Sequence, residues 1–415
     1  MNNQISLRTS CRICGNNKLV NFINLNKMPL ADLFVKNPKA KEHRFPLNVK
    51  VCPNCFLVQL VNEVNPDLLF GNNYAFYTGG SPASIGYFRT YAESVIKNFP
   101  KETKHFIVEI ASNDGTLLKP FIEKGYSVLG IDPAKNVADE ANADGIPTLS
   151  KFFNKEIAQE VVFLKEKKAG IIIANNVVAH VSDLFDFMSG IKILLDDNGV
   201  FIFECQYFPY LLFNNQFDNI YHEHHSFFSL YPITKLLDKF SLEAFDVEEH
   251  HTQGGSIRVF VAHKGKRKIK KRFINYLKNE KEMGINNIET YLGFNARVNY
   301  IKIKLNQLLK GLKENNKKIA GYGASAKSST LVNYCEIGTD YLDYIVDKTP
   351  YKYGLYSPGM HIPVISSEIE SKRKEKPDYY LLLVWNYAEK IIEREKEFIK
   401  RGGKFIIPIP TPYIR

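Results

Sequence analysis

The chain has 415 residues, so two or three domains are expected, each large enough to bury a core of its own. Its formal net charge is +11, but the basic residues are spread along the sequence with only one tight run, which argues against a nucleic-acid partner. The polar start at residues 1–4 lacks a signal peptide's apolar segment, and no apolar stretch approaches the roughly 20 residues of a membrane span. We therefore expect a cytoplasmic, monomeric protein with no nucleic-acid or membrane partner.

Four of the six cysteines form two C-x-x-C pairs, Cys11 with Cys14 and Cys52 with Cys55. This spacing lets each turn aim two thiolates at one ion about 2.3 Å away. Four thiolates leave no open coordination position, so the pairs predict a structural Zn²⁺ without a catalytic role. Disulfides are the alternative, and they are uncommon inside cells.

An aromatic loop is expected at residues 70–82, after a short strand at 56–60. Ser81 is placed to cap the helix that follows, because Pro82 suits the first turn of a helix. Tyr74 and Tyr77 in this loop are candidates for hydrogen-bonding a ligand. The alternative is that they only pack a domain junction.

A doubly wound pattern begins with a strand at residues 106–110, a tight loop at 111–115 and a helix at 116–124. The next strand, residues 126–131, ends at Asp132. This layout is typical of a nucleotide-like ligand bound at the carboxyl ends of parallel strands, with the terminal acid on the ribose hydroxyls.

The loop at residues 111–115 indicates which ligand this is. A dinucleotide site needs three glycines for close approach to the pyrophosphate, whereas this loop has one glycine and the polar side chains of Asn113 and Asp114. Such a loop suits a ligand without phosphates, such as S-adenosylmethionine, whose amino-acid end needs polar partners. An ordinary strand-to-helix turn is the alternative.

Three further strands are expected in this domain, at residues 145–150, 171–174 and 200–204. Phe152 follows the first of them and is placed to flank an adenine. Asn175, Asn176 and His180 follow the second, so they should lie in the same crevice as the cofactor.

The segment Tyr221-His222-Glu223-His224-His225 follows the strand at 200–204. Three imidazoles, a carboxylate and a phenol within five residues favour proton transfer near neutral pH. In an extended or turn segment, His222 and His224 should share one side. A metal site and a surface cluster are the alternatives, although helical metal pairs favour i, i+4 spacing.

The last third of the chain predicts a second sheet. A strand at residues 252–261 should close the first sheet, the basic run 264–272 should be a solvated linker, and a helix over 288–312 should join the two sheets. A strand at 318–320 then enters a glycine-rich loop with Gly321, Gly323 and Lys327, which favours a phosphate at a helix start. A generic tight turn is the alternative. Further strands are expected at 344–347, 379–386 and 405–408, and the loops 347–350 and 358–363 are placed to enclose a nucleotide.

The sequence resembles a known family, the S-adenosylmethionine-dependent sugar C-methyltransferases, typified by the TDP-4-keto-deoxysugar C-3' methyltransferases. The shared motifs occur in one order over nearly the whole chain: C-x-x-C twice, E-I-A-S-N-D-G-T-L-L, G-I-D-P-A, A-N-N-V-V-A-H-V, Y-H-E-H, G-G-S-I-R-V and G-Y-G-A-S-A-K. The resemblance implies an α/β protein with three domains. They are an N-terminal zinc-binding domain (1–72), a central class I, Rossmann-like methyltransferase domain (73–265) and a C-terminal Rossmann-like nucleotide-sugar-binding domain (266–415).

The resemblance also implies roles for single residues. His224, the second histidine of Y-H-E-H, would be the general base, with Tyr221, Glu223 and His180 assisting. In the aromatic loop the family's Y-x-Y arrangement corresponds here to Tyr74-Ala75-Phe76-Tyr77, so Tyr77 would have to replace a hydroxyl missing at position 76. The cofactor-binding residues would be Glu109, Ala111, Asn113, Asp114, Asp132, Pro133, Phe152, Asn175 and Asn176, and the substrate-binding residues Tyr74, Tyr77, Arg258, Gly321, Gly323 and Lys327.

The expected reaction is methyl transfer from S-adenosylmethionine to the carbon beside the keto group of a nucleotide-linked 4-keto-deoxysugar in deoxysugar biosynthesis. His224 would remove the proton from that carbon, giving an enediolate, and C3' as the acceptor comes from the resemblance alone. Alternatives are an RNA or other small-molecule methyltransferase with a structural zinc module, and a non-catalytic scaffold. An NAD-dependent sugar epimerase or dehydrogenase is disfavoured, because the first loop lacks the dinucleotide fingerprint.

Overall fold

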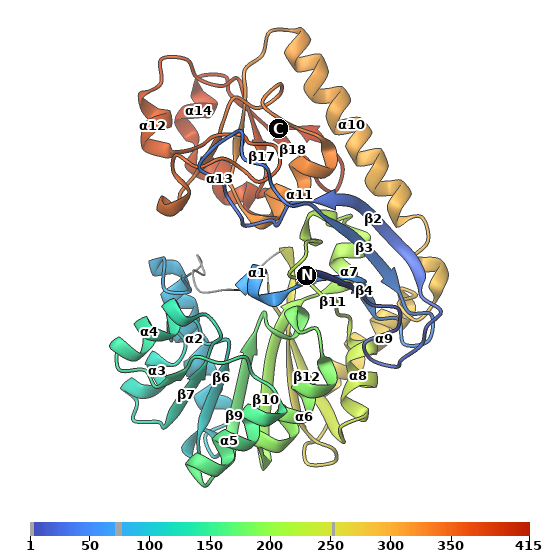
Figure 1. Ribbon diagram of the computed structural model, residues 1–415, viewed down its shortest axis with the longest axis vertical. Coiled ribbons are helices and arrows are strands. Elements are labelled where there is room, and N and C mark those ends of the chain that lie inside the picture. Colours follow the sequence, from blue (N-terminus) through green and yellow to red (C-terminus); the bar gives the residue numbers. More distant parts are fainter. Residues whose placement is uncertain (1–3, 71–76, 251–253) are drawn as a thin grey trace.

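The computed structural model describes residues 4–70, 77–250 and 254–415. Figure 1 shows two lobes, each built on a sheet flanked by helices, with a small N-terminal sheet along one side of the junction between them. No helix in the described ranges is both long enough and apolar enough to cross a bilayer.

The N-terminal sheet has the strand order β11-β4-β3-β2. Its own strands are β2 (Val20–Met28), β3 (Phe45–Val51) and β4 (Val58–Leu60), so the strand predicted near residues 56–60 is confirmed. Every second residue of β3 is buried, which gives this sheet one apolar face. The fourth strand, β11 (Ser226–Phe227), comes from far along the chain and pairs antiparallel with β4. A separate ribbon pairs β1 (Ile5–Leu7) with β5 (Asn62–Val64).

The central sheet has the order β12-β13-β10-β9-β6-β7-β8. Its parallel strands are β6 (Ile107–Ile110), β7 (Val128–Ile131), β8 (Thr148–Leu149), β9 (Ala169–Asn175) and β10 (Leu195–Gln206). β12 (Leu242–His250) and β13 (Ser256–His263) run antiparallel at one edge. The chain turns back between β6 and β9, so the doubly wound prediction is confirmed and the switch point lies between these strands.

Helices cover both faces of this sheet (Figure 1). They are α2 (Pro82–Asn98), α3 (Lys119–Glu123), α4 (Lys135–Ala143), α5 (Lys155–Lys165), α6 (Leu184–Leu194), α8 (Leu230–Asp238) and α9 (Lys271–Glu282). Ser81 caps α2 by accepting from the Ser84 amide, as predicted. The helix expected from residue 116 starts only at Lys119, because the Asp114 carboxylate accepts from both the amide and the hydroxyl of Thr116 and holds a turn there.

The C-terminal sheet has the order β16-β15-β14-β17-β18-β19. Its strands are β14 (Ile319–Tyr322), β15 (Ile345–Asp347), β16 (Val364–Ser366), β17 (Tyr379–Leu382), β18 (Lys404–Ile407) and the antiparallel β19 (Tyr413–Ile414). β17 stops at Leu382, opposite the last residue of β14, so the prediction that this strand continues to Asn386 was wrong. The switch point of this sheet lies between β14 and β17.

Three shorter helices, α12 (Ser367–Lys372), α13 (Ala388–Arg394) and α14 (Lys396–Lys400), flank this sheet, and the long α10 (Phe294–Glu314) runs along the outside of the molecule (Figure 1). The helix predicted over 288–312 is interrupted, because Gly293 adopts a left-handed conformation in front of α10.

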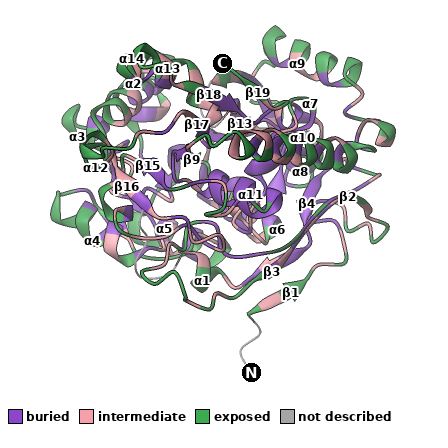
Figure 2. Cartoon of the chain, turned by 90° about the horizontal axis from the view of Figure 1, so that it is seen from above, coloured by how far each residue is buried: buried purple, intermediate pink, exposed green. Residues whose placement is uncertain are grey.

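The N-terminal sheet and the C-terminal lobe share one hydrophobic core. The ring of Phe22 on β2 stacks on Phe294 of α10, with centroids 4.4 Å apart. Every residue of α11 (Ala326–Cys335) is buried, and Figure 2 shows this helix at the centre of the molecule. The central sheet has separate cores on its two faces.

The loop between β2 and β3 is attached to the C-terminal lobe by hydrogen bonds. Val35 and Tyr356 form an antiparallel bridge with N···O distances of 3.1 and 2.8 Å. The Glu42 carboxylate lies 2.7 Å from the His361 ring nitrogen, and Ser329 Oγ donates to the Ala31 carbonyl at 2.7 Å. We call residues 29–44 the N-terminal loop.

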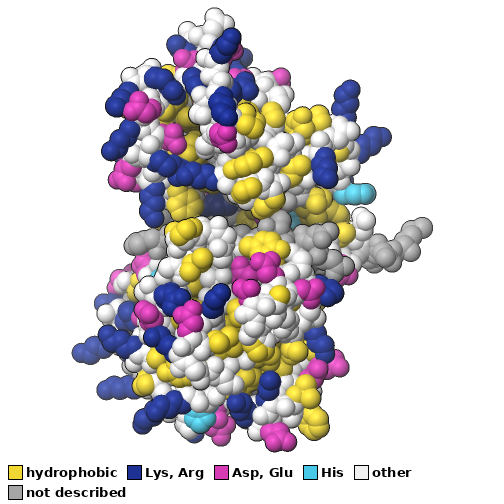
Figure 3. All heavy atoms as spheres, turned by 90° about the vertical axis from the view of Figure 1, so that its left-hand side faces the viewer, with side chains coloured by type: hydrophobic (Ala, Val, Ile, Leu, Met, Phe, Trp, Pro, Cys, Tyr) yellow, Lys and Arg dark blue, Asp and Glu magenta, His cyan; other side chains and the backbone are white. Residues whose placement is uncertain are grey.

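The basic run at residues 264–272 joins β13 to α9, and every residue in it except Arg267 is exposed, so the prediction of a solvated linker is confirmed. Arg272 lies in the first turn of α9 and pairs with Asp246 at 2.7 Å, and Arg267 pairs with Glu102. On the face shown in Figure 3, lysines and arginines lie over both lobes, interspersed with acidic side chains.

Candidate active site and zinc site

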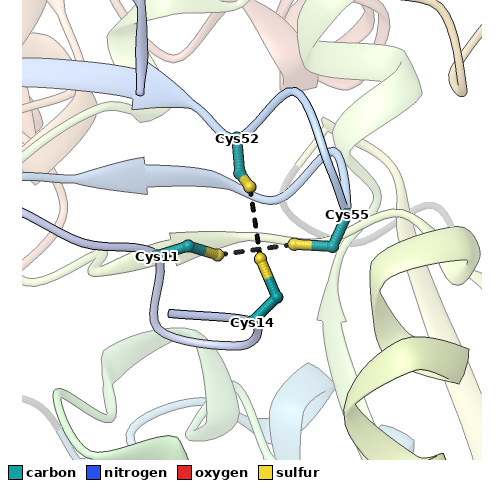
Figure 4. Close-up of side chains that lie close together, drawn as sticks. All are labelled: Cys11, Cys14, Cys52 and Cys55. Carbon is teal, nitrogen blue, oxygen red and sulfur yellow. Dashed lines mark hydrogen bonds between the residues drawn. The ribbon is translucent and has the colours of Figure 1, made fainter. Parts of the chain in front are cut away.

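The four paired cysteines converge on one point, as their spacing predicted (Figure 4). Their sulfur atoms all lie within 4.8 Å of one another, and the Cys11–Cys55 and Cys14–Cys52 sulfurs are 3.4 Å apart. Tetrahedral Zn²⁺ with Zn–S bonds of about 2.3 Å requires S···S distances of about 3.8 Å, so this cage fits zinc. All six cysteines are free, so the disulfide alternative is not supported.

The loop after β6 has a strained conformation fixed by its own neighbours. Ala111 and Asn113 have positive φ angles of 53° and 52°. Asp132 at the end of β7 accepts from the Asn113 amide at 2.8 Å and from the Ala134 amide at 2.9 Å. Burial raises the pKa of this carboxyl, and the two amides oppose that shift. Asp132 therefore holds the loop, with lone pairs remaining for a ligand.

Two side chains at the switch point carry buried polar atoms with no hydrogen-bond partner among the described residues. They are Glu109 Oε2 on β6 and Asn175 Nδ2 at the end of β9. Burial raises the pKa of Glu109 well above its ordinary value, and the carboxyls of Asp114 and Asp132 add to the shift. An unpaired acceptor and donor at this position fit a polar cofactor, because leaving them unsatisfied costs about 1–3 kcal/mol each.

The start of α2 is held against this loop. Asn113 Oδ1 accepts from the Thr78 amide at 2.9 Å, and Asp114 Oδ2 accepts from the Gly79 amide at 2.7 Å. The Tyr77 hydroxyl lies 3.1 Å from Asn136, and Tyr74 lies outside the described residues. Residues 77–79 are thus joined to the loop after β6 and to α4.

The remaining cofactor candidates surround the same sheet edge. Phe152 is 48% exposed, so its ring is available, whereas Phe153 packs on Phe187. Asn176 adopts a left-handed conformation, and its amide donates to the Glu204 carbonyl of β10. Pro133 follows Asp132 at the end of β7.

The histidine cluster forms a turn, closed by the His224 amide on the Tyr221 carbonyl at 3.0 Å. The prediction that His222 and His224 share one side was wrong, because this turn sends them to different neighbours. His222 packs edge-on against Phe45 of the N-terminal sheet, and its Nε2 lies 3.2 Å from the Phe45 carbonyl. His224 instead lies beside His180 and Tyr221, at ring distances of 4.8 and 4.0 Å.

The tautomer of His224 follows from one contact. Its Nδ1 lies 2.7 Å from the Asn219 carbonyl, which only accepts, so Nδ1 carries the hydrogen and Nε2 is left with a lone pair. Burial lowers the pKa of His224 to about 4; the Asn219 carbonyl opposes this and the Lys327 charge adds to it. His224 is therefore a neutral base at pH 7.

The pKa of Glu223 is shifted upward, whereas that of His224 is shifted downward. Burial raises the pKa of Glu223 to about 8, and the nearby Asp32 carboxyl contributes to the shift. At neutral pH Glu223 is mostly protonated and is a hydrogen-bond donor. Burial also lowers the pKa of His180 well below its ordinary value.

Arg258 on β13 lies in a buried cluster on the central sheet. It pairs with Glu204 at 2.9 Å, contacts the Tyr87 hydroxyl at 3.1 Å and stacks 3.4 Å from the centre of the Tyr91 ring. Tyr91 in turn donates to Asn175 Oδ1 at 3.2 Å. Through this chain of contacts Arg258 is connected to Asn175 at the switch point of the central sheet.

The glycine-rich loop after β14 repeats the geometry of the first loop. Asp347 at the end of β15 accepts from the Ala324 amide at 2.6 Å and from the Thr349 amide at 2.7 Å, as Asp132 does in the central sheet. Ser325 and Ser328 cap the start of α11 reciprocally. These bonds occupy amides that were expected to bind phosphate, so the loop offers fewer free donors than its glycines indicated.

The two glycines of this loop have packing roles. A Cβ at Gly321 would lie 2.9 Å from Ile345, and one at Gly323 would lie 2.4 Å from Val384. Gly323 also has a φ angle of 93°, which disfavours any other residue. Lys327 is 6% exposed, and its ammonium lies 4.7 Å from the centre of the Trp385 ring.

Sequence reasoning missed two charged residues near Glu223 of the histidine cluster. Lys352 is buried, donates to the Ala324 carbonyl at 2.7 Å and lies 4.0 Å from Asp32. Asp32 belongs to the N-terminal loop, and burial raises the pKa of its carboxyl, with Lys352 opposing the shift. Neither residue lies in a motif, so only the folded structure brings them together.

Comparisons with known proteins cover the whole of this architecture. A zinc binding domain model matches residues 11–70, a methyltransferase domain model matches 86–246, and a C-methyltransferase C-terminal domain model matches 251–410. The C-methyltransferase NovU of Streptomyces niveus is 34% identical over 407 residues, an alignment that covers 97% of this chain and 96% of the relative.

Solved structures resemble a smaller part of the chain. The PH0226 protein from Pyrococcus horikoshii OT3 has a TM-score of 0.36 at 13% identity and covers 46% of this chain and 96% of its own. Magnesium protoporphyrin IX methyltransferase from Synechocystis PCC 6803 has a TM-score of 0.34 at 13% identity and covers 43% and 82%.

Proposed function

The chain belongs to the S-adenosylmethionine-dependent C-methyltransferase family, and from this membership we propose that it methylates the carbon beside the keto group of a nucleotide-linked 4-keto-deoxysugar, at C3' by analogy with the sugar C-methyltransferases that its motifs resemble. The observation that carries the proposal is the neutral His224, whose Nε2 lone pair is left free by the Asn219 carbonyl. Bound S-adenosylmethionine supplies an electrophilic methyl group.

The cofactor lies at the switch point of the central sheet in this proposal. Asp132 accepts from the ribose hydroxyls, while Glu109 and Asn175 use the polar atoms that the protein leaves unpaired. The substrate enters from the C-terminal lobe, with its nucleotide at the second switch point. There Asn386 Oδ1 is a buried acceptor without a partner among the described residues.

His224 removes the proton from the carbon beside the ketone and holds it on Nε2. Glu223 is protonated at neutral pH and donates a hydrogen bond as negative charge develops on the carbonyl oxygen. Tyr221 and His180 flank the imidazole and restrict its orientation. General-base assistance of this kind typically contributes about 10²- to 10⁴-fold.

The test is to incubate the enzyme and S-adenosylmethionine with TDP-, CDP- and GDP-linked 4-keto sugars and to identify the methylated product and its carbon by mass spectrometry and NMR. In His224→Asn, both ligands should still bind, while kcat and solvent-deuterium exchange at the carbon beside the ketone both fall by about 10²-fold or more. His222→Asn is the matched control and should retain exchange, because His222 contacts Phe45 instead. If deuterium exchange survives in His224→Asn and is lost in His222→Asn, His224 is not the general base.

A further inference from the structure

The helix that carries Lys327 is buried between three parts of the molecule. Thr330 of α11 donates to the Ile220 carbonyl of the central domain at 3.1 Å, and Ser329 donates to the Ala31 carbonyl of the N-terminal loop. The rest of α11 packs in the core shared by the N-terminal sheet and the C-terminal lobe. Lys327, the second residue of this helix, therefore has its side chain inside the protein and not at an open helix end.

Two buried charged atoms in this region have no hydrogen-bond partner among the described residues. One is a donor, Lys327 Nζ, and the other is an acceptor, Asp218 Oδ1. Both contact the same indole, since Trp385 Nε1 donates to Asp218 Oδ2 at 2.7 Å and the Lys327 ammonium lies 4.7 Å from the Trp385 ring centre. They form no direct ion pair within the described residues, although the charge of each group shifts the pKa of the other.

Leaving a buried charged group unsatisfied costs more than the roughly 1–3 kcal/mol of a neutral one. A partner that offers one acceptor and one donor on neighbouring atoms would satisfy both Lys327 and Asp218. A carbonyl group next to a hydroxyl-bearing carbon has this arrangement.

Lys327 lies close enough to His224 for its charge to act on the imidazole. Asp218 directly precedes Asn219, whose carbonyl fixes the His224 tautomer. Trp385 lies three residues after the end of β17, one of the two strands at the switch point of the C-terminal sheet. The unpaired donor and acceptor therefore lie between the second switch point and the residue that orients His224.

We propose that Lys327 and Asp218 bind the α-hydroxyketone of the sugar, with Lys327 donating to the carbonyl oxygen and Asp218 accepting from the hydroxyl group on the adjacent carbon. This inference rests on the function proposed above and narrows its substrate class to 4-keto sugars that retain a hydroxyl group beside the ketone. It assigns Lys327 to the reacting end of the substrate and not to the diphosphate.

The assignment gives Lys327 a part in the proton-transfer step. When His224 takes the proton, the C–H electron pair forms a carbon–carbon double bond and the carbonyl π pair moves onto oxygen. The resulting enediolate oxygen carries negative charge against the Lys327 ammonium. A charge-assisted hydrogen bond in a buried site stabilises that charge more than the neutral ketone, so it accelerates the step.

The test compares Lys327→Met with Lys318→Met in the full-length enzyme. Lys318 is the matched control, because it pairs with Glu375 on the surface. Lys318 lies just before β14, whereas Lys327 lies beyond the loop that follows this strand. We expect Lys327→Met to lower kcat and deuterium exchange at least 100-fold with S-adenosylmethionine affinity unchanged, and Lys318→Met to behave as wild type. Turnover within threefold of wild type in Lys327→Met would overturn the role of Lys327.

Asp218→Asn tests the other half of the pair and keeps an oxygen to accept from Trp385. The substrates are a TDP-4-keto sugar with the adjacent hydroxyl group and the same sugar without it. Wild type should prefer the hydroxyl-bearing sugar at least tenfold in kcat/KM, and Asp218→Asn should reduce that preference, because the hydroxyl group loses the charge-assisted hydrogen bond that the carboxylate accepts. An equal preference in both enzymes would overturn the role of Asp218.

The emission of Trp385, the chain's single tryptophan, reports whether the sugar reaches this position. The TDP-4-keto sugar should change it in wild type, and less so in Lys327→Met. Unchanged emission in a wild type that turns the sugar over would contradict the assignment. A wild type that binds S-adenosylmethionine but methylates none of the keto sugars would instead refute the proposed function.

Discussion

The carbonyl of Asn219 sets the protonation pattern of the His224 ring, and with it the ring nitrogen that would accept the proton in the proposed reaction. Because Nδ1 donates to that carbonyl, the lone pair can only be on Nε2. Burial keeps the imidazole neutral, and the same burial keeps Glu223 protonated. Two consecutive residues thus hold a free base and a neutral acid, and each has its pKa shifted in the direction that its proposed role needs.

The pH dependence of kcat/KM should show the titration of both His224 and Glu223. His224 must be unprotonated, so activity should rise with pH through about 4, and Glu223 must be protonated, so activity should fall as pH rises through about 8. Glu223→Gln keeps a donor that does not titrate and should remove the alkaline limb while leaving the acid limb in place. An alkaline limb that persists unchanged in Glu223→Gln would exclude Glu223 as the acid.

Asp132 holds the cofactor loop and, in the proposal, the ribose. Asp132→Ala removes two bonds to loop amides as well as the acceptor for the ribose, so S-adenosylmethionine affinity should fall by about tenfold or more. Nucleotide-sugar affinity should stay within about twofold, since that ligand is assigned to the other sheet. Isothermal titration of both ligands measures this, and an equal loss of both would contradict two separate crevices.

The sequence indicated the cysteine cage and the residues around both switch points, because these follow from spacing and from strand order. The positions of His222 and His224 depend on a turn that the Tyr221 carbonyl closes. No hydrophobic periodicity in the sequence reveals this turn. Contacts between distant segments of the chain create the surroundings of Asp218, Asp32 and Lys352. No nearby sequence motif therefore identifies these residues.

At the scale of single elements, helix α8 depends on a residue from another helix. Its N-cap, Ser229, makes no side-chain capping bond. Glu280 of α9 accepts instead from the Leu230 and Tyr231 amides at 2.6 and 2.9 Å, and from the Tyr207 hydroxyl at 2.9 Å. Two helices separated by two strands are thereby fixed to one another.

Glu280→Ala should lower the free energy of unfolding by about 2 kcal/mol, because it removes a cap and leaves buried donors unpaired. Urea denaturation measures the change. Glu282→Ala in the same helix is the control, since Glu282 pairs with Lys278 on the surface and should shift stability by less than about 0.5 kcal/mol. Equal effects of the two variants would contradict the capping role.

Strands were predicted better than helix starts, for a physical reason. A buried strand such as β9 is recognisable from its unbroken apolar run. The start of α3 depended on the side chain of Asp114, and the start of α10 on the backbone of Gly293. Such local interactions move an element boundary without altering the hydrophobic pattern.

In the whole molecule, the zinc cage is linked to the histidine cluster by the N-terminal sheet. β11 follows the cluster by one residue and pairs with β4, and the Leu60 amide donates to the His225 carbonyl at 2.9 Å. The Phe45 carbonyl contacts His222. A structural ion can therefore influence the position of the turn at residues 221–225 without touching it.

Removal of zinc by chelation, or by Cys52→Ser, should lower the melting temperature and increase amide hydrogen exchange in β2, β3 and β4. Substrate affinity should fall more than S-adenosylmethionine affinity, because the N-terminal loop contacts the C-terminal lobe, whereas Asp132 of the central sheet holds the loop after β6. Mass spectrometry of peptides after exchange and titration of both ligands measure these effects. Cys335→Ser, outside the cage, is the control for metal content.

The pairing of β11 with β4 has a consequence for synthesis of the protein on the ribosome. The strand β4 ends at Leu60, but its neighbour in the sheet begins only at Ser226. At about 5–20 residues per second, the nascent N-terminal segment waits roughly 8 to 33 seconds before its partner emerges. During that interval the edge of β4 has unpaired backbone groups and the face that will pack on α10 is uncovered. Early capture of zinc by the two cysteine pairs would shorten the exposure to aggregation, so metal supply during translation should govern the yield of soluble enzyme.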